Sequence, residues 1–233
     1  MKIALVGYGK MGRTIEKIAI KEKIEIVCII DKKMQKGDLS KADVSINFCV
    51  PSAAVENIIK SFDHKIPVVC GTTGWLDDFD LVKKYCEEKQ TAFIYSSNFS
   101  FGVNIFFKIT QYLASLMNKY DSPFNISIEE THHKEKVDSP SGTAISLAND
   151  IIEKNNSFIS WGKNKNSKSI SMISKRQNKK IGVHKVSFES KLDKLQIQHE
   201  AFSRDSFAKA SIIAPKWIQN KKGIFNMDDI IGF

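Results

Sequence analysis

Apolar residues in the first part of the chain form short continuous runs, separated by segments with helical spacing. The first helical segment carries apolar residues at i, i+4, i+7 and i+8, namely Met11, Ile15, Ile18 and Ala19. Strands that are apolar throughout are typically buried on both faces, so the pattern predicts a parallel sheet with helices on each side. The predicted strands span residues 2–7, 24–30, 44–50, 67–70 and 91–95.

The pattern changes after Asn98. Helical spacing predicts helices over about 103–118 and 143–154, while alternating polarity predicts strands. Such alternation is typical of a mixed or antiparallel sheet with one open face, and we expect this open apolar face to meet a copy of itself in an oligomer. The alternating segments span residues 125–130, 169–175, 181–190 and 194–202.

Helical spacing returns from Ser206 to Trp217. Pro215 conflicts with an uninterrupted helix, because proline lacks the backbone N–H and its ring crowds the preceding turn. We therefore expect a kink or an early stop at that residue. Taken together, the patterns predict an α/β protein with a parallel-sheet domain and a smaller mixed α/β domain that has an open sheet.

The charge of the chain gives little indication of a nucleic-acid partner. The 233 residues carry a formal net charge of +9, but the lysines are scattered, without a basic helix or interleaved aromatic residues. No apolar run is long enough to cross a bilayer, and the apolar stretch at residues 1–7 is too short for a signal peptide. The sequence thus predicts a cytoplasmic protein that binds neither nucleic acid nor membrane.

The cysteines do not form a metal-binding or disulfide pattern. None of the four belongs to a Cys-x-x-Cys pair, and all lie in apolar runs, where a thiol acts as a small hydrophobic group. We expect neither disulfides nor a zinc site at Cys28, Cys49, Cys70 and Cys86.

A glycine motif follows the first predicted strand and opens the first predicted helix, as a Rossmann-type dinucleotide site requires. Its glycines allow a tight turn, a close approach of the backbone to a pyrophosphate, and close packing of helix on strand. The helix amino terminus adds free N–H groups and partial positive charge. The motif is Gly7-Tyr8-Gly9-Lys10-Met11-Gly12.

Asp31 ends the second predicted strand about 20 residues after the motif, where an acid can bind a ribose hydroxyl. Lys32 and Lys33 follow, and either could accept a 2′-phosphate, so we expect both NADH and NADPH to be used. Two loops after later strands offer backbone amides and short polar side chains for a nicotinamide, although each could also be a plain turn. They are Gly71-Thr72-Thr73-Gly74 and Ser96-Ser97-Asn98-Phe99.

The segment from Glu129 to Ala144 holds two of the five histidines and ends with Ser141-Gly142-Thr143 entering a predicted helix. It supplies an imidazole, an ammonium group and helix-terminal amides, which can bind carboxylates and deliver a proton beside a hydride acceptor. A surface turn with a helix cap is the alternative. A metal site of Glu129, His132 and His133 is disfavoured, because neighbouring strand residues point to opposite faces.

The pattern Glu130-Thr131-His132-His133-x-x-Lys136-Val137-Asp138-x-Pro140-Ser141-Gly142-Thr143 closely resembles the signature of the dihydrodipicolinate reductase family. The resemblance extends over nearly the whole chain. Further matching segments are Gly7 to Arg13, Gly71 to Gly74, Asn98 to Asn104 and His199 to Ala208. Two departures are a shorter stretch from Asp31 to Asp43 and Lys209 in place of the usual glycine.

The resemblance implies reduction of dehydrated 4-hydroxy-tetrahydrodipicolinate, a small dicarboxylate, to tetrahydrodipicolinate in the diaminopimelate and lysine pathway. It implies that His132 is the proton donor, that Lys136 is a second catalytic residue, and that His133 and Ser141-Gly142-Thr143 bind substrate carboxylates. The glycine motif, Asp31, Lys32 and the two later loops would form the cofactor site.

The resemblance also implies a Rossmann-type domain over residues 1–102, completed by 205–233. An inserted domain over 103–204 would bind substrate and form a homotetramer. Two other functions stay open on the residues alone: a Rossmann oxidoreductase of another small carboxylic acid, and a dinucleotide-binding sensor without catalysis that binds DNA through its positive charge.

Overall fold

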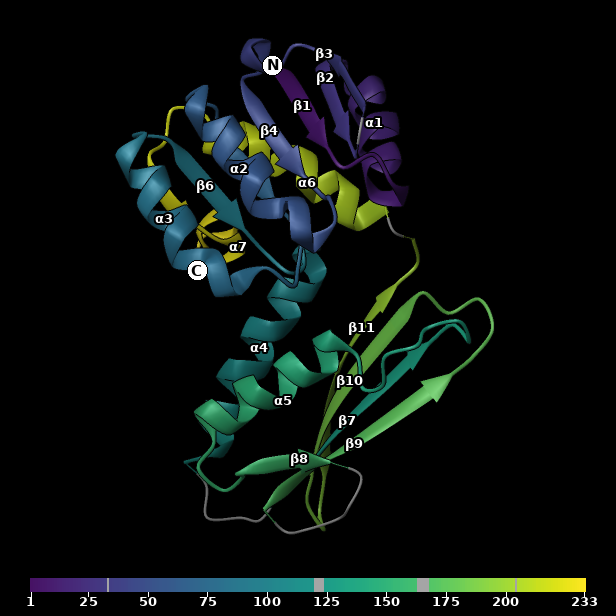
Figure 1. Cartoon of the computed structure of the whole chain (residues 1–233). Helices are drawn as coiled ribbons and strands as arrows, with labels where there is room; N and C mark the ends of the chain where they lie inside the picture. Colours follow the sequence, from purple (N-terminus) through teal and green to yellow (C-terminus); the bar gives the residue numbers. More distant parts are fainter. Residues whose placement is uncertain (33, 120–123, 163–167, 204) are drawn as a thin grey trace. The chain divides into compact units, whose positions relative to one another are not determined.

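The computed structural model of the chain describes residues 1–32, 34–119, 124–162, 168–203 and 205–233. By their contacts, these residues form two compact units (Figure 1). Unit 1 combines Met1–Phe101 with Asp205–Phe233, and unit 2 is Gly102–Arg204. Among the described residues, no helix has the length and apolar character needed to cross a membrane.

Unit 1 is built on a seven-stranded sheet in the order β12-β6-β5-β4-β1-β2-β3. All neighbouring pairs are parallel except β2 and β3. The chain runs from β1 to β2 on one side and later places β4 on the other side of β1, so the strand order reverses at the carboxyl end of β1. The strands are β1 (Lys2–Val6), β2 (Glu25–Asp31), β3 (Met34–Gly37), β4 (Val44–Asn47), β5 (Val68–Cys70), β6 (Ala92–Tyr95) and β12 (Gly223–Phe225).

Helices cover both faces of this sheet. Alternate residues of β1 show why, since Ile3 and Leu5 pack with Ile15 of α1 whereas Ala4 packs with Leu39 on the opposite face. Burial on both faces explains the continuous apolar runs in the sequence. The helices are α1 (Lys10–Lys21), α6 (Asp205–Ile218) and α7 (Met227–Ile231) on one face, and α2 (Ala54–Asp63) and α3 (Phe79–Glu88) on the other. Short 3₁₀ turns lie at Leu39–Lys41, Pro51–Ala53 and Leu76–Asp78.

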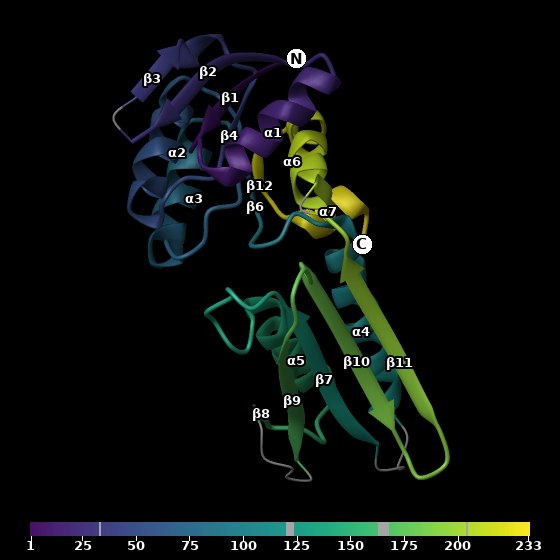
Figure 2. The same cartoon turned by 90° about the vertical axis from the view of Figure 1, so that its right-hand side faces the viewer.

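Unit 2 has a five-stranded mixed sheet in the order β11-β10-β7-β9-β8, whose long strands lie side by side in Figure 2. Helices α4 and α5 pack on one face, where Phe106, Leu147 and Ile151 meet Ile128 and Val186 in a buried cluster. The elements are α4 (Phe101–Met117), β7 (Asn125–His132), α5 (Gly142–Lys154), β8 (Ser160–Gly162), β9 (Ser169–Arg176), β10 (Gly182–Glu189) and β11 (Lys194–Ala201).

The other face of this sheet is open, as predicted, but it is not apolar. Ile126 and Ile128 of β7 and Val186 and Phe188 of β10 point to the helices, and the residues on the open face are mainly polar. Val183 of β10 and Ile173 of β9 are apolar exceptions, and Ile173 has 41% of its surface exposed. The polar residues include Ser127, Glu129, Lys175, Lys185, Gln196 and Gln198.

Of the two outcomes expected at Pro215, the early stop was wrong, because α6 continues through Pro215 to Ile218, and the kink stays a prediction. The missing proline N–H costs one helical hydrogen bond, but Ala210, Ala214 and Ile218 are buried against the sheet. Burial of this face outweighs the lost bond, since packing supplies most helix stability in proteins.

The sequence patterns missed four short elements: β3, β8, β12 and α7. Each is five residues or shorter, so hydrophobic periodicity has too few positions to show itself. Strand β3 occupies the shortened stretch between Asp31 and Asp43, where it closes the edge of the sheet as a hairpin with β2.

Candidate functional site

The glycine motif lies at the carboxyl end of β1, at the point where the strand order reverses. This is where ligands bind in open parallel sheets. Gly7 has a φ of +91°, and a Cβ there would lie 2.1 Å from the carbonyl oxygen of Phe48. A Cβ on Gly12 would lie 2.3 Å from the Gly7 carbonyl oxygen. Both positions therefore need glycine to let the turn, β4 and α1 approach one another.

Gly9 differs from these two glycines, because a Cβ there would meet no atom of the described residues within 4 Å. The open space borders the start of α1, which has no side-chain cap and no acidic residue in its first turn. The first amides of α1 are therefore not used by a capping side chain, as an anion-binding turn requires. This cradle fits a dinucleotide pyrophosphate.

The neighbouring residues of the predicted cofactor site differ in accessibility. Asp31 ends β2 and is partly exposed, and Lys32 follows it with a φ of +43°. Lys10 is exposed, Met11 packs beside the buried Ile15, and the Tyr8 hydroxyl donates to Glu16. Lys33, the second predicted base, lies outside the described residues.

The loop after β5 is held tightly against the protein. A Cβ on Gly71 would overlap the Phe48 ring at 2.0 Å. The buried hydroxyl of Thr72 accepts a hydrogen bond of 3.0 Å from the Cys49 amide, so this side chain already has a hydrogen-bond partner within the protein. Thr73 is exposed, and Gly74 has a φ of +77°.

The loop after β6 is organised by its own polar side chains. Ser96 Oγ donates to the Asn98 carbonyl at 2.7 Å, and Asn98 Oδ1 accepts from the Ser100 amide at 2.9 Å. Ser97 is exposed, whereas the Phe99 ring is buried in the core of unit 1. Contacts of Thr72 and Phe99 with a cofactor would therefore have to come from their backbones.

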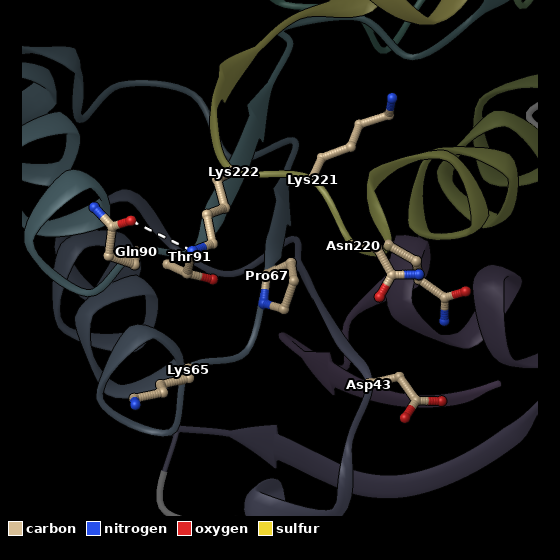
Figure 3. A pocket seen from close by; sticks show the side chains of 9 residues that line it. Asp43, Lys65, Pro67, Gln90, Thr91, Asn220, Lys221 and Lys222 are labelled. Carbon is tan, nitrogen blue, oxygen red and sulfur yellow. Dashed lines mark hydrogen bonds between the residues drawn. The ribbon is translucent and has the colours of Figure 1, made fainter.

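A cavity of about 610 Å³ lies at the opposite edge of the same sheet (Figure 3). Its lining includes residues that precede strands, such as Asp43, Pro67 and Thr91. Lys222 reaches across one side and donates to Gln90 Oε1 at 3.4 Å. None of the predicted site residues lines this cavity.

In unit 2, the predicted proton donor His132 is the last residue of β7 and is only 7% exposed. Its Nδ1 lies 3.4 Å from Glu130 Oε2, and among the described residues no atom forms a well-aligned hydrogen bond with Nδ1. Its Nε2 faces the Cα of Gly182, where a Cβ would come within 3.2 Å. The His184 ring meets the His132 ring edge-to-face, with 5.0 Å between the ring centroids.

Glu130 is fully buried at the centre of this cluster. Both of its carboxylate oxygens accept from the Ser141 amide at 3.1 Å, and Arg176 Nη1 lies 3.7 Å from Oε1. His184 Nε2 lies 3.8 Å from Oε2 and 3.1 Å from Ser141 Oγ. Because β7, β9 and β10 are neighbours, residues far apart in the sequence meet around one carboxylate.

The predicted carboxylate-binding turn begins α5. Ser141 is the N-cap, and its hydroxyl accepts from the Ala144 amide at 3.3 Å. Gly142 has open space where a Cβ would be, and Thr143 is partly exposed. The turn therefore presents a helix amino terminus with room beside it.

Lys136 and His133 lie in the loop between β7 and α5. Lys136 Nζ contacts both carboxylate oxygens of Asp138 at 2.8 Å. His133 Nδ1 lies 3.2 Å from Glu135 Oε2. Arg176 stabilises this loop, because its Nε donates to the Lys136 carbonyl and its Nη2 to the Asp138 carbonyl at 3.3 and 2.7 Å.

The electrostatics of the cluster favour a neutral His184 beside an ionised Glu130. Burial lowers the pKa of His184 to about 4, and the neighbouring His132 adds to this effect. Burial also lowers the pKa of His132, although the Glu130 charge opposes that shift. For Glu130, burial alone raises the pKa, but hydrogen bonds from Ser141 and Ser174 outweigh it and the net shift is downward.

Glu130, His132 and His184 could in principle hold a metal, since one ligand atom from each lies within 4.8 Å of the others. Their present contacts are those of a hydrogen-bonded cluster instead. Both Glu130 oxygens already accept from Ser141, and the Arg176 charge stands beside them. In the other candidate triad, Glu129 and His132 point to opposite faces of β7, and His133 lies in the loop that follows the strand.

The structure thus brings His132, Lys136 and Ser141 into one unit, around residues that the sequence pattern did not single out: Glu130, Arg176 and His184. Glu130 belonged to the quoted signature without a role. Arg176 and His184 carried no signal of their own, because only the sheet pairing brings them close.

Family models match both parts of the chain. Residues 1–99 match the model of the dihydrodipicolinate reductase N-terminus, and residues 102–231 match the model of its C-terminus. The chain belongs to the dihydrodipicolinate reductase family. This confirms the resemblance seen in the sequence, the α/β fold class, and the prediction of an oxidoreductase that uses NADH or NADPH.

Curated relatives extend over the whole length. The 4-hydroxy-tetrahydrodipicolinate reductase of Christiangramia forsetii is 44% identical over 99% of this chain and 98% of its own length. The enzyme of that name from Archaeoglobus fulgidus is 33% identical over 99% of this chain and its entire length. A solved structure described as dipicolinate-bound dihydrodipicolinate reductase from Paenisporosarcina sp. TG-14 has a TM-score of 0.82 at 22% identity, covering 99% of each chain, and shows the shared fold.

Proposed function

We propose that this chain reduces the dehydrated form of 4-hydroxy-tetrahydrodipicolinate to tetrahydrodipicolinate, with His132 as the proton donor and Lys136 stabilising the charge that develops. The relatives named for this reductase activity support the reaction, which agrees with the expectation from the sequence. The observation that carries the residue assignment is the cluster in unit 2. There a buried imidazole, a lysine and an open helix amino terminus come together at the carboxyl end of the central strand β7.

The substrate class follows from the charges that unit 2 offers. Two of its side chains, those of Lys136 and Arg176, are positively charged hydrogen-bond donors. The amides of Gly142 and Thr143 at the start of α5 add neutral donors. Such groups bind carboxylates well. The solved relative described as dipicolinate-bound carries a small aromatic dicarboxylate. We therefore assign a small dicarboxylate to this chain, with His133 and the turn at 141–143 as its contacts.

The cofactor would bind in unit 1, with its pyrophosphate on the Gly7–Gly12 turn and a ribose hydroxyl on Asp31. When bound, the reduced nicotinamide supplies a hydride. In the same reaction His132 gives the proton on Nε2 to the substrate atom that becomes negative, and the imidazolium becomes a neutral imidazole that water reprotonates. Lys136 leaves Asp138 to stabilise that developing charge.

A bound dianion favours the protonated state of His132 through its opposite charge, which offsets the effect of burial on the pKa. Proton donation is thereby coupled to substrate binding. The homotetramer and the cytoplasmic location remain predictions, and light scattering of the purified chain tests the first.

The deciding experiment supplies NADH or NADPH and generates the substrate in place, from pyruvate and aspartate semialdehyde with the upstream synthase. We expect oxidation of the reduced nicotinamide that depends on the synthase. A folded chain that binds NADH but gives no such oxidation would refute the assignment. In that case, salt-sensitive DNA binding would favour the sensor, and oxidation with another small acid would favour a different oxidoreductase.

A further inference from the structure

Two neighbouring glutamates on β7 have opposite environments. Glu129 points to the open face of the sheet, where its oxygens lie 2.7 Å from Lys175 Nζ and 3.3 Å from Lys185 Nζ. Glu130 points to the helix-covered face and has no exposed surface. Successive strand residues point to opposite faces of a sheet, so the two carboxylates have different surroundings although their residues are neighbours on one strand.

Burying a charge is costly, and an ionised carboxylate remains buried only where several donors surround it. Glu130 has such partners on three other elements: the Ser141 amide at the start of α5, which donates to it, Arg176 at the end of β9 and His184 on β10. The His132 ring, on β7 itself, lies beside the same carboxylate. Each of these groups belongs to, or holds, a different part of the candidate site.

We propose that Glu130 is a positioning residue for the reduction, because its carboxylate simultaneously orients the His132 ring, the carboxylate-binding turn at Ser141 and the loop that carries Lys136. This inference rests on the proposed function of His132. The family comparison assigns no role to Glu130.

The first effect is on the orientation of the His132 ring. Glu130 Oε2 lies 3.4 Å from Nδ1 without a well-aligned hydrogen bond between them, and substrate binding can shorten and align such a contact. A proton on Nδ1 is favoured by this carboxylate, which leaves Nε2 as the atom that gains and loses the catalytic proton. Gly182 leaves room beside that nitrogen.

The second effect is on the groups that would hold the substrate. By accepting from the Ser141 amide with both oxygens, Glu130 fixes the N-cap whose hydroxyl caps α5. By attracting Arg176, it fixes the guanidinium that donates to the carbonyls of Lys136 and Asp138. One charge therefore aligns the proton donor with the substrate-binding groups.

The test compares Glu130→Gln with Glu129→Gln, two variants that make the same chemical change at adjacent positions. We expect Glu130→Gln to lower kcat about tenfold or more and to raise the KM for the dicarboxylate, because misplaced groups lose preorganisation. The KM for NADH should stay unchanged. Glu129→Gln should keep both parameters near wild type.

The pH profile separates positioning from a merely structural role. The charges facing His132 are Glu130 on β7, Arg176 on β9, and Lys136 and Asp138 in the loop, with His184 on β10. Of these, Glu130 is the largest influence that favours the protonated ring. In Glu130→Gln the alkaline limb of the pH profile of kcat should therefore move to lower pH by about one pH unit. An unchanged limb, with kcat equal to that of Glu129→Gln, would overturn the proposal.

A measurement on the wild-type chain covers the case in which Glu130→Gln does not fold. Nitrogen-15 NMR of the neutral His132 ring, assigned by comparison with His132→Gln, should show the proton on Nδ1. A proton on Nε2 would overturn the positioning role. Failure of the proposed function is distinguishable, because it appears as absent turnover in the wild-type chain, whichever tautomer is found.

Discussion

The turn before α1 and the turn before α5 both offer a helix amino terminus to an anion, but they are completed differently. Gly9 leaves α1 without a side-chain cap, and no acidic residue stands in its first turn. At α5, the Ser141 hydroxyl caps the helix and the Ser141 amide is bound by the buried Glu130. The first site is made of backbone, and the second depends on a network of charged side chains.

This difference has a chemical reason. A pyrophosphate needs many N–H groups and no proton transfer, so an uncapped helix is sufficient. A reacting dicarboxylate needs its proton donor and its binding groups in fixed relative positions, which requires connected side chains. The two sites should therefore respond differently to substitutions and to pH.

The largest expected effect comes from His132→Ala. Loss of the proton donor should lower kcat by about 100-fold or more, in the range of general acid catalysis. NADH binding should be unchanged, because the cofactor site is assigned to unit 1. Steady-state kinetics and a fluorescence titration of NADH test the two parts, and an unchanged kcat would remove His132 from the mechanism.

The site at α5, which is built from side chains, should also make the free energy of unfolding depend on pH, through His184. Its pKa of about 4 in the folded chain lies below the ordinary 6.5, because burial and the neighbouring His132 disfavour its charge. Between these values the unfolded chain binds more protons, so the free energy of unfolding should fall as the pH falls from 6.5 to 4, by up to about 3 kcal/mol. Below that window the contribution of His184 is already lost.

Urea unfolding across this window measures the effect. His184→Gln should weaken the pH dependence, whereas substitution of the exposed His64 should preserve it. Equal pH dependence in wild type and His184→Gln would mean that His184 does not carry the linkage.

The site at α1, which is made of backbone, could be predicted from the sequence more completely than the site at α5, which is made of side chains. The glycine motif is local, and the clash distances at Gly7 and Gly12 show that its spacing follows from how one turn packs. Likewise, the long strands of unit 1 were predicted because burial on both faces makes them continuously apolar. Short edge strands such as β3 and β12 could not be predicted, because they have too few residues to show a hydrophobic periodicity.

The cluster around Glu130 could not be predicted in full, because its members meet only through sheet pairing. Glu130 lies opposite His184 on β10 and beside Ser174 on β9. Arg176, which pairs in register with His132, is 44 positions further along the chain. The polar character of the open sheet face was missed because the sequence did not show that α4 and α5 both cover the apolar face, which leaves the polar face open.

Two matched glycine substitutions sharpen the comparison of the helix termini. A Cβ at Gly9 or at Gly142 would meet no atom in the part of the chain that the structure describes, so alanine should leave the fold intact at both positions. Gly9→Ala should weaken NADH binding about tenfold by filling the space for the pyrophosphate, with little change in the KM for the dicarboxylate. Gly142→Ala should do the reverse.

Isothermal titration with NADH and steady-state kinetics distinguish these outcomes. Thermal unfolding serves as the control, because neither variant should be destabilised by a clash. If both variants weakened only NADH binding, the turn at α5 would belong to the cofactor and not to the substrate.

The smallest expected effect probes the free nitrogen of His132. In Gly182→Ala the new methyl group would lie 3.2 Å from Nε2 and 3.4 Å from Cδ2, so the ring must shift by a few tenths of an ångström. A shift of this size should lower kcat about three- to fivefold without changing NADH binding, because proton transfer depends on alignment. Gly162→Ala is the matched control, since it lies in the same sheet and its methyl would meet no atom of the described residues. Equal kcat in the two variants would indicate that Nε2 is not the atom that transfers the proton, whereas a loss confined to Gly182→Ala supports Nε2 as that atom and Nδ1 as the one held by Glu130.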